Sequence, residues 1–213
     1  TIFNLFFSSI CIIILINGSN FCDGVNCNVV GYYLIVSLAI LFGAFPNPAN
    51  FPDIRIIITI FFIFYLLNLF QKSFLGDNGV YVINAFMAIY LIHFINLNSY
   101  ISPILALNLL WYPAFENLFS ILRRIIKKKK VQEPDQNHLH QMIYNLLIKT
   151  KFINYKFINT STGLIINLYN FIMFLIFYKF YTKTDILVLG IFINIFVYLF
   201  LYFFIKKKLK HLK

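Results

Sequence analysis

Charged side chains are scarce in this sequence of 213 residues, and acidic ones are the scarcest. Charged residues make up 12% of the chain, whereas soluble domains usually carry about 25%. Hydrophobic residues make up 61%, and the mean hydropathy is +0.80. This balance excludes a water-soluble globular domain and indicates an integral membrane protein.

The three cysteines are too few for a disulfide framework and poorly placed for a zinc site. Cys22 and Cys27 have no second cysteine pair and no histidine close by. The chain begins with Thr1, and no basic segment precedes the first apolar run, which argues against a signal peptide. We expect the natural protein to begin further upstream, with residues 1–213 forming one integral membrane domain.

Lysine and arginine outnumber the acidic residues by 18 to 7, which gives a formal net charge of +11. In a soluble protein this excess would suggest a nucleic-acid partner. In a membrane protein the positive-inside rule accounts for it, because Lys and Arg gather in cytoplasmic loops. We therefore expect a membrane environment and no nucleic acid.

Seven apolar segments separated by turn residues predict an all-α, polytopic transmembrane helix bundle of about seven spans. If the spans alternate between two sides, only Arg55, Lys179 and Lys183 fall on one side, and the other Lys and Arg mark the opposite side as cytoplasmic. The C-terminus is then cytoplasmic, and residues 123–162 form a cytoplasmic loop. The expected spans are residues 2–16, 29–45, 54–70, 80–95, 101–115, 164–180 and 186–205.

Three polar segments on the expected cytoplasmic side carry groups suited to ligand binding. In the first, Asn17, Asn20 and Asp23 recur every three residues and Gly24 follows. On a helix these side chains would lie within an arc of about 120°. They suit a polar ligand, but a capped helix end followed by a glycine turn explains the same residues.

The second segment, residues 74–79, is a short turn with Asp77 between two glycines. A carboxylate with room around it suits Mg²⁺, which takes one or two carboxylates together with substrate phosphates. An ordinary turn between two spans would also favour Asp and Gly.

The third segment, residues 123–140, contains Arg123 and Arg124, four consecutive lysines, and His138 and His140. The lysine run is a topology signal or a contact with anionic lipid headgroups. Alternate residues of an extended stretch share a side, so both imidazoles could meet one phosphate, nucleotide or metal. A metal held by these residues alone lacks an evident third ligand.

In this order, the segments resemble the motifs of the polyprenyl-phosphate N-acetylhexosamine-1-phosphate transferases, the WecA/MraY-type family (glycosyltransferase family 4). The resemblance covers about the first two-thirds of the chain. Val80 and Glu116 stand where the family has Ser and Asp, and the family's earlier Asp-Asp loop is absent. The matching stretches are residues 17–24 (N-x-x-N-x-x-D-G), 74–79 (F-[LM]-G-D-x-G), 113–116 (P-x-x-D), Arg123-Arg124, and 135–140 (D-x-x-H-x-H).

The resemblance implies transfer of a sugar-1-phosphate, with N-acetylhexosamine the expected sugar, from a UDP-sugar to undecaprenyl phosphate, which releases UMP. It places this reaction at the cytoplasmic face of a bacterial inner membrane, in lipopolysaccharide or other cell-envelope glycan synthesis. The implied cofactor is Mg²⁺, with Mn²⁺ as an alternative, and a homodimer stays open. The implied roles are catalysis for Asp77 and Asp23, metal binding for Asp77, and substrate binding for Asn17, Asn20, Arg123, Arg124, His138 and His140.

Two alternatives to an active transferase stay open. One is a truncated, inactive homologue, because the Asp-Asp loop is missing. The other is a small, non-catalytic subunit of a transport or respiratory complex. Polar residues in the middle of the expected spans are mostly neutral amides, with His93 the titratable exception. A proton path needs a chain of ionisable groups, so this composition argues against the second alternative.

Overall fold

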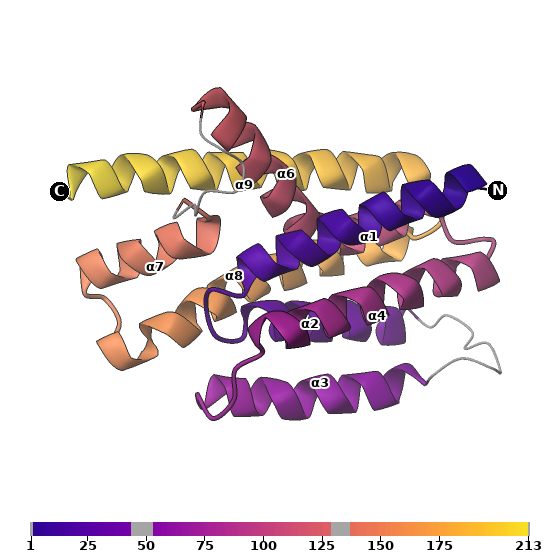
Figure 1. Ribbon diagram of the computed structural model, residues 1–213, viewed down its shortest axis with the longest axis horizontal. Coiled ribbons are helices and arrows are strands. Elements are labelled where there is room, and N and C mark those ends of the chain that lie inside the picture. The colour runs from indigo at the N-terminus through magenta and orange to yellow at the C-terminus, as the bar shows by residue number, and fades with distance from the viewer. Residues whose placement is uncertain (1, 44–52, 129–136, 213) are drawn as a thin grey trace.

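The computed structural model describes residues 2–43, 53–128 and 137–212, and within these ranges the chain is helical with no strand (Figure 1). This confirms the expected all-α helix bundle. The helices are α1 (Ile2–Cys22), α2 (Asn28–Phe42), α3 (Ile54–Leu69), α4 (Gly76–Leu97), α5 (Ile104–Leu109), α6 (Trp111–Ile126), α7 (Leu139–Thr150), α8 (Tyr155–Phe177), a 3-10 turn η1 (Tyr178–Phe180) and α9 (Thr184–His211).

The chain is a multi-pass membrane protein. Four helical stretches are long and apolar enough to cross a bilayer: Leu5–Cys22, Gly76–Leu97, Tyr155–Phe180 and Thr184–His211. Helices α2 and α3 are apolar but shorter. Large apolar side chains cover the outside of the bundle, among them those of Ile56, Leu189 and Phe196. So large an exposed apolar surface is suited to lipid rather than to water.

The fifth expected span, residues 101–115, is two helices rather than one. Helix α5 ends before Leu110, and α6 starts at Trp111 and runs across the direction of its neighbours (Figure 1). Pro113 lies in the first turn of α6, where its missing N–H leaves no hydrogen bond unmade. The break directs one side of α6, including Glu116 and Arg123, into the protein.

Much of residues 123–162, which we expected to form a loop, is helical in the parts that the structure describes. Helix α6 continues to Ile126, and α8 begins at Tyr155. Between them, α7 packs against α8 and α9. The backbone N–H of His138 donates to the Gln141 side chain at 3.2 Å, which helps to fix the start of α7. The third polar segment is thereby anchored to the membrane helices.

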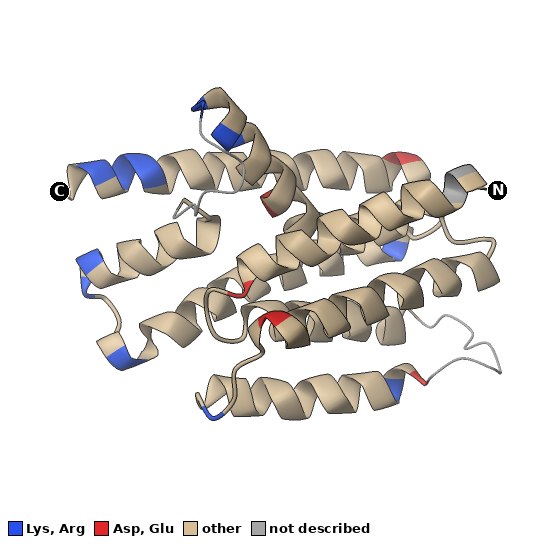
Figure 2. Cartoon of the chain, viewed as in Figure 1, with Lys and Arg blue, Asp and Glu red and all other residues tan. Residues whose placement is uncertain are grey.

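Lysine and arginine gather at one end of the bundle, around the ends of α3, α7 and α9 and the start of α8 (Figure 2). The opposite end, where α3 and α9 begin, has few basic residues (Figure 2). The segregation is the one that the alternating spans predict.

Buried amides fix the turn between α1 and α2. The backbone N–H of Cys27 donates to Asn68 of α3, and its carbonyl accepts from Asn167 of α8 at 2.7 Å. The backbone N–H of Asn26 donates to Asn159 at 2.7 Å. Two helices, α3 and α8, therefore hold the turn that begins with Asp23.

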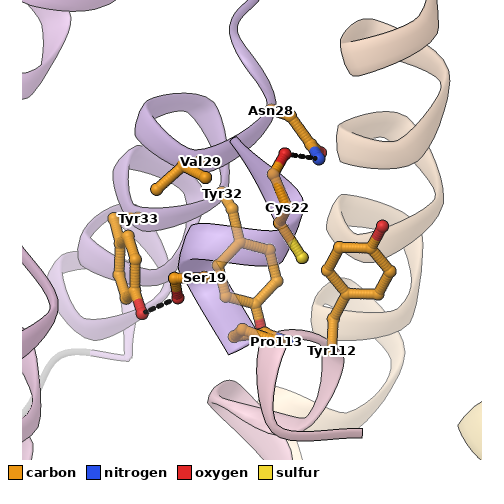
Figure 3. Close-up of a pocket in the computed structure, with 8 residues that line it drawn as sticks. All are labelled: Ser19, Cys22, Asn28, Val29, Tyr32, Tyr33, Tyr112 and Pro113. Carbon is orange, nitrogen blue, oxygen red and sulfur yellow. Dashed lines mark hydrogen bonds between the residues drawn. The ribbon is translucent and has the colours of Figure 1, made fainter. Parts of the chain in front are cut away.

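Tyrosines of α2 and α6 surround the end of α1 (Figure 3). The hydroxyls of Tyr33 and Ser19 lie 3.1 Å apart, and both bond to Asn84 of α4. Asn28 donates to the carbonyl of Cys22 at 2.7 Å (Figure 3). These contacts fix the end of α1 before the polar turn starts.

Candidate active site

The first polar segment is the end of α1 and the turn after it. Asn17 and Asn20 lie in the last turns of the helix, and Asp23 follows it. Asn17 is exposed and donates to the carbonyl of Ile13 at 3.0 Å. Beside it, Gly18 packs on the backbone of Pro113, where a Cβ would overlap the carbonyl oxygen. The glycine thus allows α1 and α6 to cross closely just before the polar turn.

Asp23 lies beside the start of α4, which brings the first two segments together. Gly76 begins α4 with a φ of 63°, and its backbone hydrogen bonds to the Asp23 carboxylate. The pKa of Asp23 is raised from 3.8 to about 6, mainly by burial and also by the charge of Asp77, while the hydrogen bond from Gly76 opposes the rise. Asp77 itself is exposed in the first turn of α4. Two carboxylates therefore share one region.

The carboxylates of Asp23 and Asp77 suit a magnesium ion, which shares its ligands with substrate and water, better than a metal whose ligands all come from the protein. Mg²⁺ commonly takes one or two carboxylates and completes its shell with waters and substrate phosphates. Among the residues that the structure describes, no group of three His, Cys, Asp or Glu forms a metal cluster. Asp135 of the D-x-x-H-x-H stretch falls at 129–136, outside the described residues.

The third segment reaches the first through Gly24 and His140. A Cβ on Gly24 would lie 2.5 Å from Nε2 of His140, so the glycine lies directly against the imidazole. His140 is buried in the first turn of α7, and neither ring nitrogen has a hydrogen-bond partner within the described protein. Burial lowers the pKa of His140 to about 4. The charge of Glu116 opposes this shift and that of His138 adds to it, so the imidazole is neutral at pH 7.

His138 is held by a buried carboxylate. Its Nδ1 lies 2.9 Å from Oε1 of Glu116, and Oε2 accepts from the Tyr198 hydroxyl at 2.6 Å. The ring of His138 lies parallel to that of His140, with centroids 5.7 Å apart. It also lies 5.1 Å from the Phe21 ring of α1. Two histidines predicted to meet one ligand are thus adjacent and fixed.

Arg123 and Arg124 are buried at the end of α6 rather than extended into solvent. The Arg123 guanidinium lies over the Phe119 and Tyr202 rings, at 5.2 and 5.5 Å from their centroids. That of Arg124 lies 5.4 Å from the centroid of Phe21, the ring that also contacts His138. Cation–π contacts therefore hold both charges inside the protein, and Phe21 links that of Arg124 to His138.

Two cavities matter for ligand binding, and Gly24 of the first polar segment lines one of them. A polar cavity of about 410 Å³ lies between the turn after α1 and the helices α7 and α8. An apolar cavity of about 310 Å³ lies among α1, α4, α5 and α6. The polar cavity is lined by Gly24, Val25, Gln141, Tyr144, Asn145 and Asn159.

Comparison with known proteins gives one informative relative. Over 89 residues the chain is 33% identical to a Bacillus subtilis (strain 168) protein named as a probable undecaprenyl-phosphate N-acetylglucosaminyl 1-phosphate transferase. The match covers 40% of this chain and 24% of the relative. The matched part is thus about a quarter of the relative's length. No family model and no solved structure matches the chain. Over the matched stretch, the chain is therefore distantly similar to part of a protein named as a probable transferase.

All eight predicted site residues lie in the described part of the chain. The structure brings Asp23 near Asp77, Gly24 against His140, and His138 into contact with Phe21 and Glu116. The side chain of Asn17 bonds to its own helix, at Ile13, rather than to a histidine. The roles of all eight residues stay predictions. Glu116 has no role among the residues predicted from the sequence, although a lone acid in an apolar helix is a signal for one. Tyr198, in the last apolar helix, offered none.

Proposed function

We propose that this chain belongs to an enzyme that transfers N-acetylhexosamine-1-phosphate from a UDP-sugar to undecaprenyl phosphate and releases UMP. The observation that carries the proposal is the meeting of three polar segments, with Asp23 beside Asp77 and Gly24 against His140. The distant relative, which is named for such a reaction, supports it. The segregation of basic residues supports a site at the cytoplasmic face, with a cytoplasmic C-terminus.

The polar cavity is the proposed place for the nucleotide. Gln141, Asn145 and Asn159 bring amide groups that both donate and accept hydrogen bonds, as the edge of a uracil ring does. Gly24 belongs to the same lining and follows Asp23. A nucleotide in this cavity would therefore direct its phosphates toward the two carboxylates and the histidines.

Catalysis in this site rests on positioning and on neutralising charge. A phosphate oxygen of the lipid attacks the phosphorus that carries the sugar, and the bond from that phosphorus to the UMP oxygen breaks. Both reactants are anions, so they must be brought together against their repulsion. A bound Mg²⁺ would supply positive charge at the pyrophosphate.

The protein's own groups have distinct tasks in this scheme. Asp77, with Asp23 beside it, would hold the metal ion, and Asn20 and Asp23 would orient the nucleotide. Arg123 and Arg124 add a fixed positive field. His138 and His140 would hydrogen bond the diphosphate, with His140 contributing a neutral N–H rather than a charge.

The apolar cavity is the proposed place for the first part of the polyprenyl chain. Its lining comes from membrane helices and is almost wholly apolar, from Phe7 of α1 to Leu118 of α6. A lipid chain held there would keep its phosphate at the polar end of α1. The membrane lipid and the UDP-sugar thus approach the site from different sides.

The proposal is tested with the natural full-length protein in detergent or lipid vesicles. We expect UMP release from UDP-GlcNAc that depends on undecaprenyl phosphate and Mg²⁺, and a loss of about 100-fold or more in Asp77→Ala. An inactive homologue would bind UDP-GlcNAc without turnover. A transport or respiratory subunit would do neither. Undiminished turnover in Asp77→Ala would remove the metal role.

A further inference from the structure

We infer that Glu116 and Tyr198 are positioning residues for His138. They hold its imidazole with the proton on Nδ1 and leave Nε2 as the ring nitrogen that meets the substrate phosphates. The part that concerns phosphates rests on the proposed function, whereas the part that concerns the tautomer does not.

The carboxylate of Glu116 is wholly buried, with 0% of the residue exposed. Burying a carboxylate is very unfavourable unless its oxygens are bonded. Each oxygen here has a different partner: Oε1 lies 2.9 Å from Nδ1 of His138, and Oε2 lies 2.6 Å from the Tyr198 hydroxyl. The acid is therefore held from two sides by groups that favour its charged form.

The chemistry of the three groups fixes the position of the proton. An ionised carboxylate only accepts hydrogen bonds, so both Nδ1 and the tyrosine hydroxyl must donate. With Nδ1–H bonded to Glu116, Nε2 is either a free lone pair or, in the imidazolium form, a second donor. The lone pair can take a proton from the lipid phosphate, and the imidazolium can donate to a diphosphate oxygen. The negative charge of Glu116 compensates that imidazolium.

Tyr198 brings α9 into the site, although α9 lies outside the stretch that carries the motifs. Its ring is buried among other aromatic rings, where phenylalanine would pack equally well. The hydroxyl is the part that packing does not require, and it is directed at Glu116. The rings around it are those of Trp111, Tyr112, Phe115, Phe119 and Tyr202.

The tautomer can be read directly from the ring nitrogens of His138. We would label the histidine nitrogens of the full-length protein isotopically and record their NMR shifts, with His138→Gln to assign the signal. The wild type should show Nδ1 protonated. In Glu116→Gln the amide can donate to Nδ1, so the proton should move to Nε2. A His138 signal that is the same in wild type and Glu116→Gln would overturn the inference.

Activity gives the second readout. We expect kcat to fall about 10- to 100-fold in Glu116→Gln and by a smaller factor in Tyr198→Phe, with KM for UDP-GlcNAc little changed. Glu116→Asp keeps the charge and should retain most activity and the wild-type tautomer. The control is Tyr169→Phe, which removes a tyrosine hydroxyl that bonds α9 at Asn194 but does not contact Glu116.

The variants separate failure of the inference from failure of the proposed function. If Glu116→Gln does not fold, the comparison of Tyr198→Phe with Tyr169→Phe decides, since equal kcat values in those two would overturn a role for Tyr198. A tautomer that switches in a protein without transferase activity would refute the proposed function and leave the positioning of His138 standing.

Discussion

Gly24 lies directly against the imidazole of His140: a Cβ on this glycine would lie 2.5 Å from Nε2. Through this contact the turn after α1 touches the start of α7, two segments far apart in the chain. Because His140 is buried, its ring has little room to move away. The absence of a side chain at Gly24 thus determines how closely the first and third polar segments approach.

Gly24→Ala should therefore displace His140 and lower both stability and turnover. We expect a destabilisation of about 1–3 kcal/mol, as for other overpacked sites, measured by thermal unfolding in detergent. His140→Ala should make room for the new methyl group, so the double variant should be more stable than the sum of the single effects. Simple additivity would mean that the two residues do not touch.

Mg²⁺ should stabilise the protein through Asp23 and Asp77. The two carboxylates repel each other, and a divalent ion between them relieves that repulsion. We expect the unfolding temperature of wild type to rise with Mg²⁺, and that of Asp77→Asn to respond far less. Asp185→Asn, at the start of α9, is the matched control and should behave like wild type. An equal response in wild type and Asp77→Asn would contradict a metal site here.

The buried imidazole of His140 should make stability depend on pH. Its pKa in the folded protein is about 4, against about 6.5 for an unfolded histidine. Between these values the unfolded state binds a proton that the folded state does not, so this contribution to stability falls as the pH drops from about 6.5 toward 4. His140→Asn should lose that part of the slope.

Asp23 acts in the opposite direction over part of this range. Its folded pKa of about 6 lies above the ordinary value of 3.8, so protonation below pH 6 favours the folded state. The test is therefore the difference in unfolding midpoint between wild type and His140→Asn across pH, and not the total slope.

Filling the apolar cavity should weaken binding of the lipid substrate alone. Ala114→Phe adds a ring to the lining between α1 and α6. We expect KM for undecaprenyl phosphate to rise about 10-fold, on the scale of losing one good apolar contact, and KM for UDP-GlcNAc to stay unchanged. Because the cavity is assigned to the first part of the polyprenyl chain, a short-chain polyprenyl phosphate should show the same rise in KM. A rise in KM for UDP-GlcNAc as well would place the lipid elsewhere.

Hydropathy predicts most of the bundle, because each membrane helix needs a long apolar run between polar turns. The expected span at residues 54–70 agrees closely with α3. Helices α4, α8 and α9 are longer than the expected spans, because each continues into polar residues at one or both ends. The break at Leu110 was not predictable in this way, since the sequence on both sides of it stays apolar. Neither was α7, whose apolar positions are spaced for a helix but lie in a polar stretch.

The predicted site divides along similar lines. Local spacing indicates Asp23, Asp77, His138 and His140, because the residue types and their order are visible in the sequence. The partners of those residues depend on tertiary packing. The bond between Glu116 and His138 exists because α6 turns at Leu110 and directs its acid inward, and the bond to Tyr198 requires α9 to lie alongside it.

The central claim, that the sugar moves together with its phosphate, is tested most directly with doubly labelled UDP-GlcNAc. The β-phosphorus carries one radioactive label and the sugar carries another, and the full-length protein is given undecaprenyl phosphate and Mg²⁺. We predict that both labels enter the lipid product in equal amounts, that unlabelled UMP is released, and that Asp77→Asn transfers neither label. Entry of the sugar label alone, or of no label with the wild type, would contradict the account.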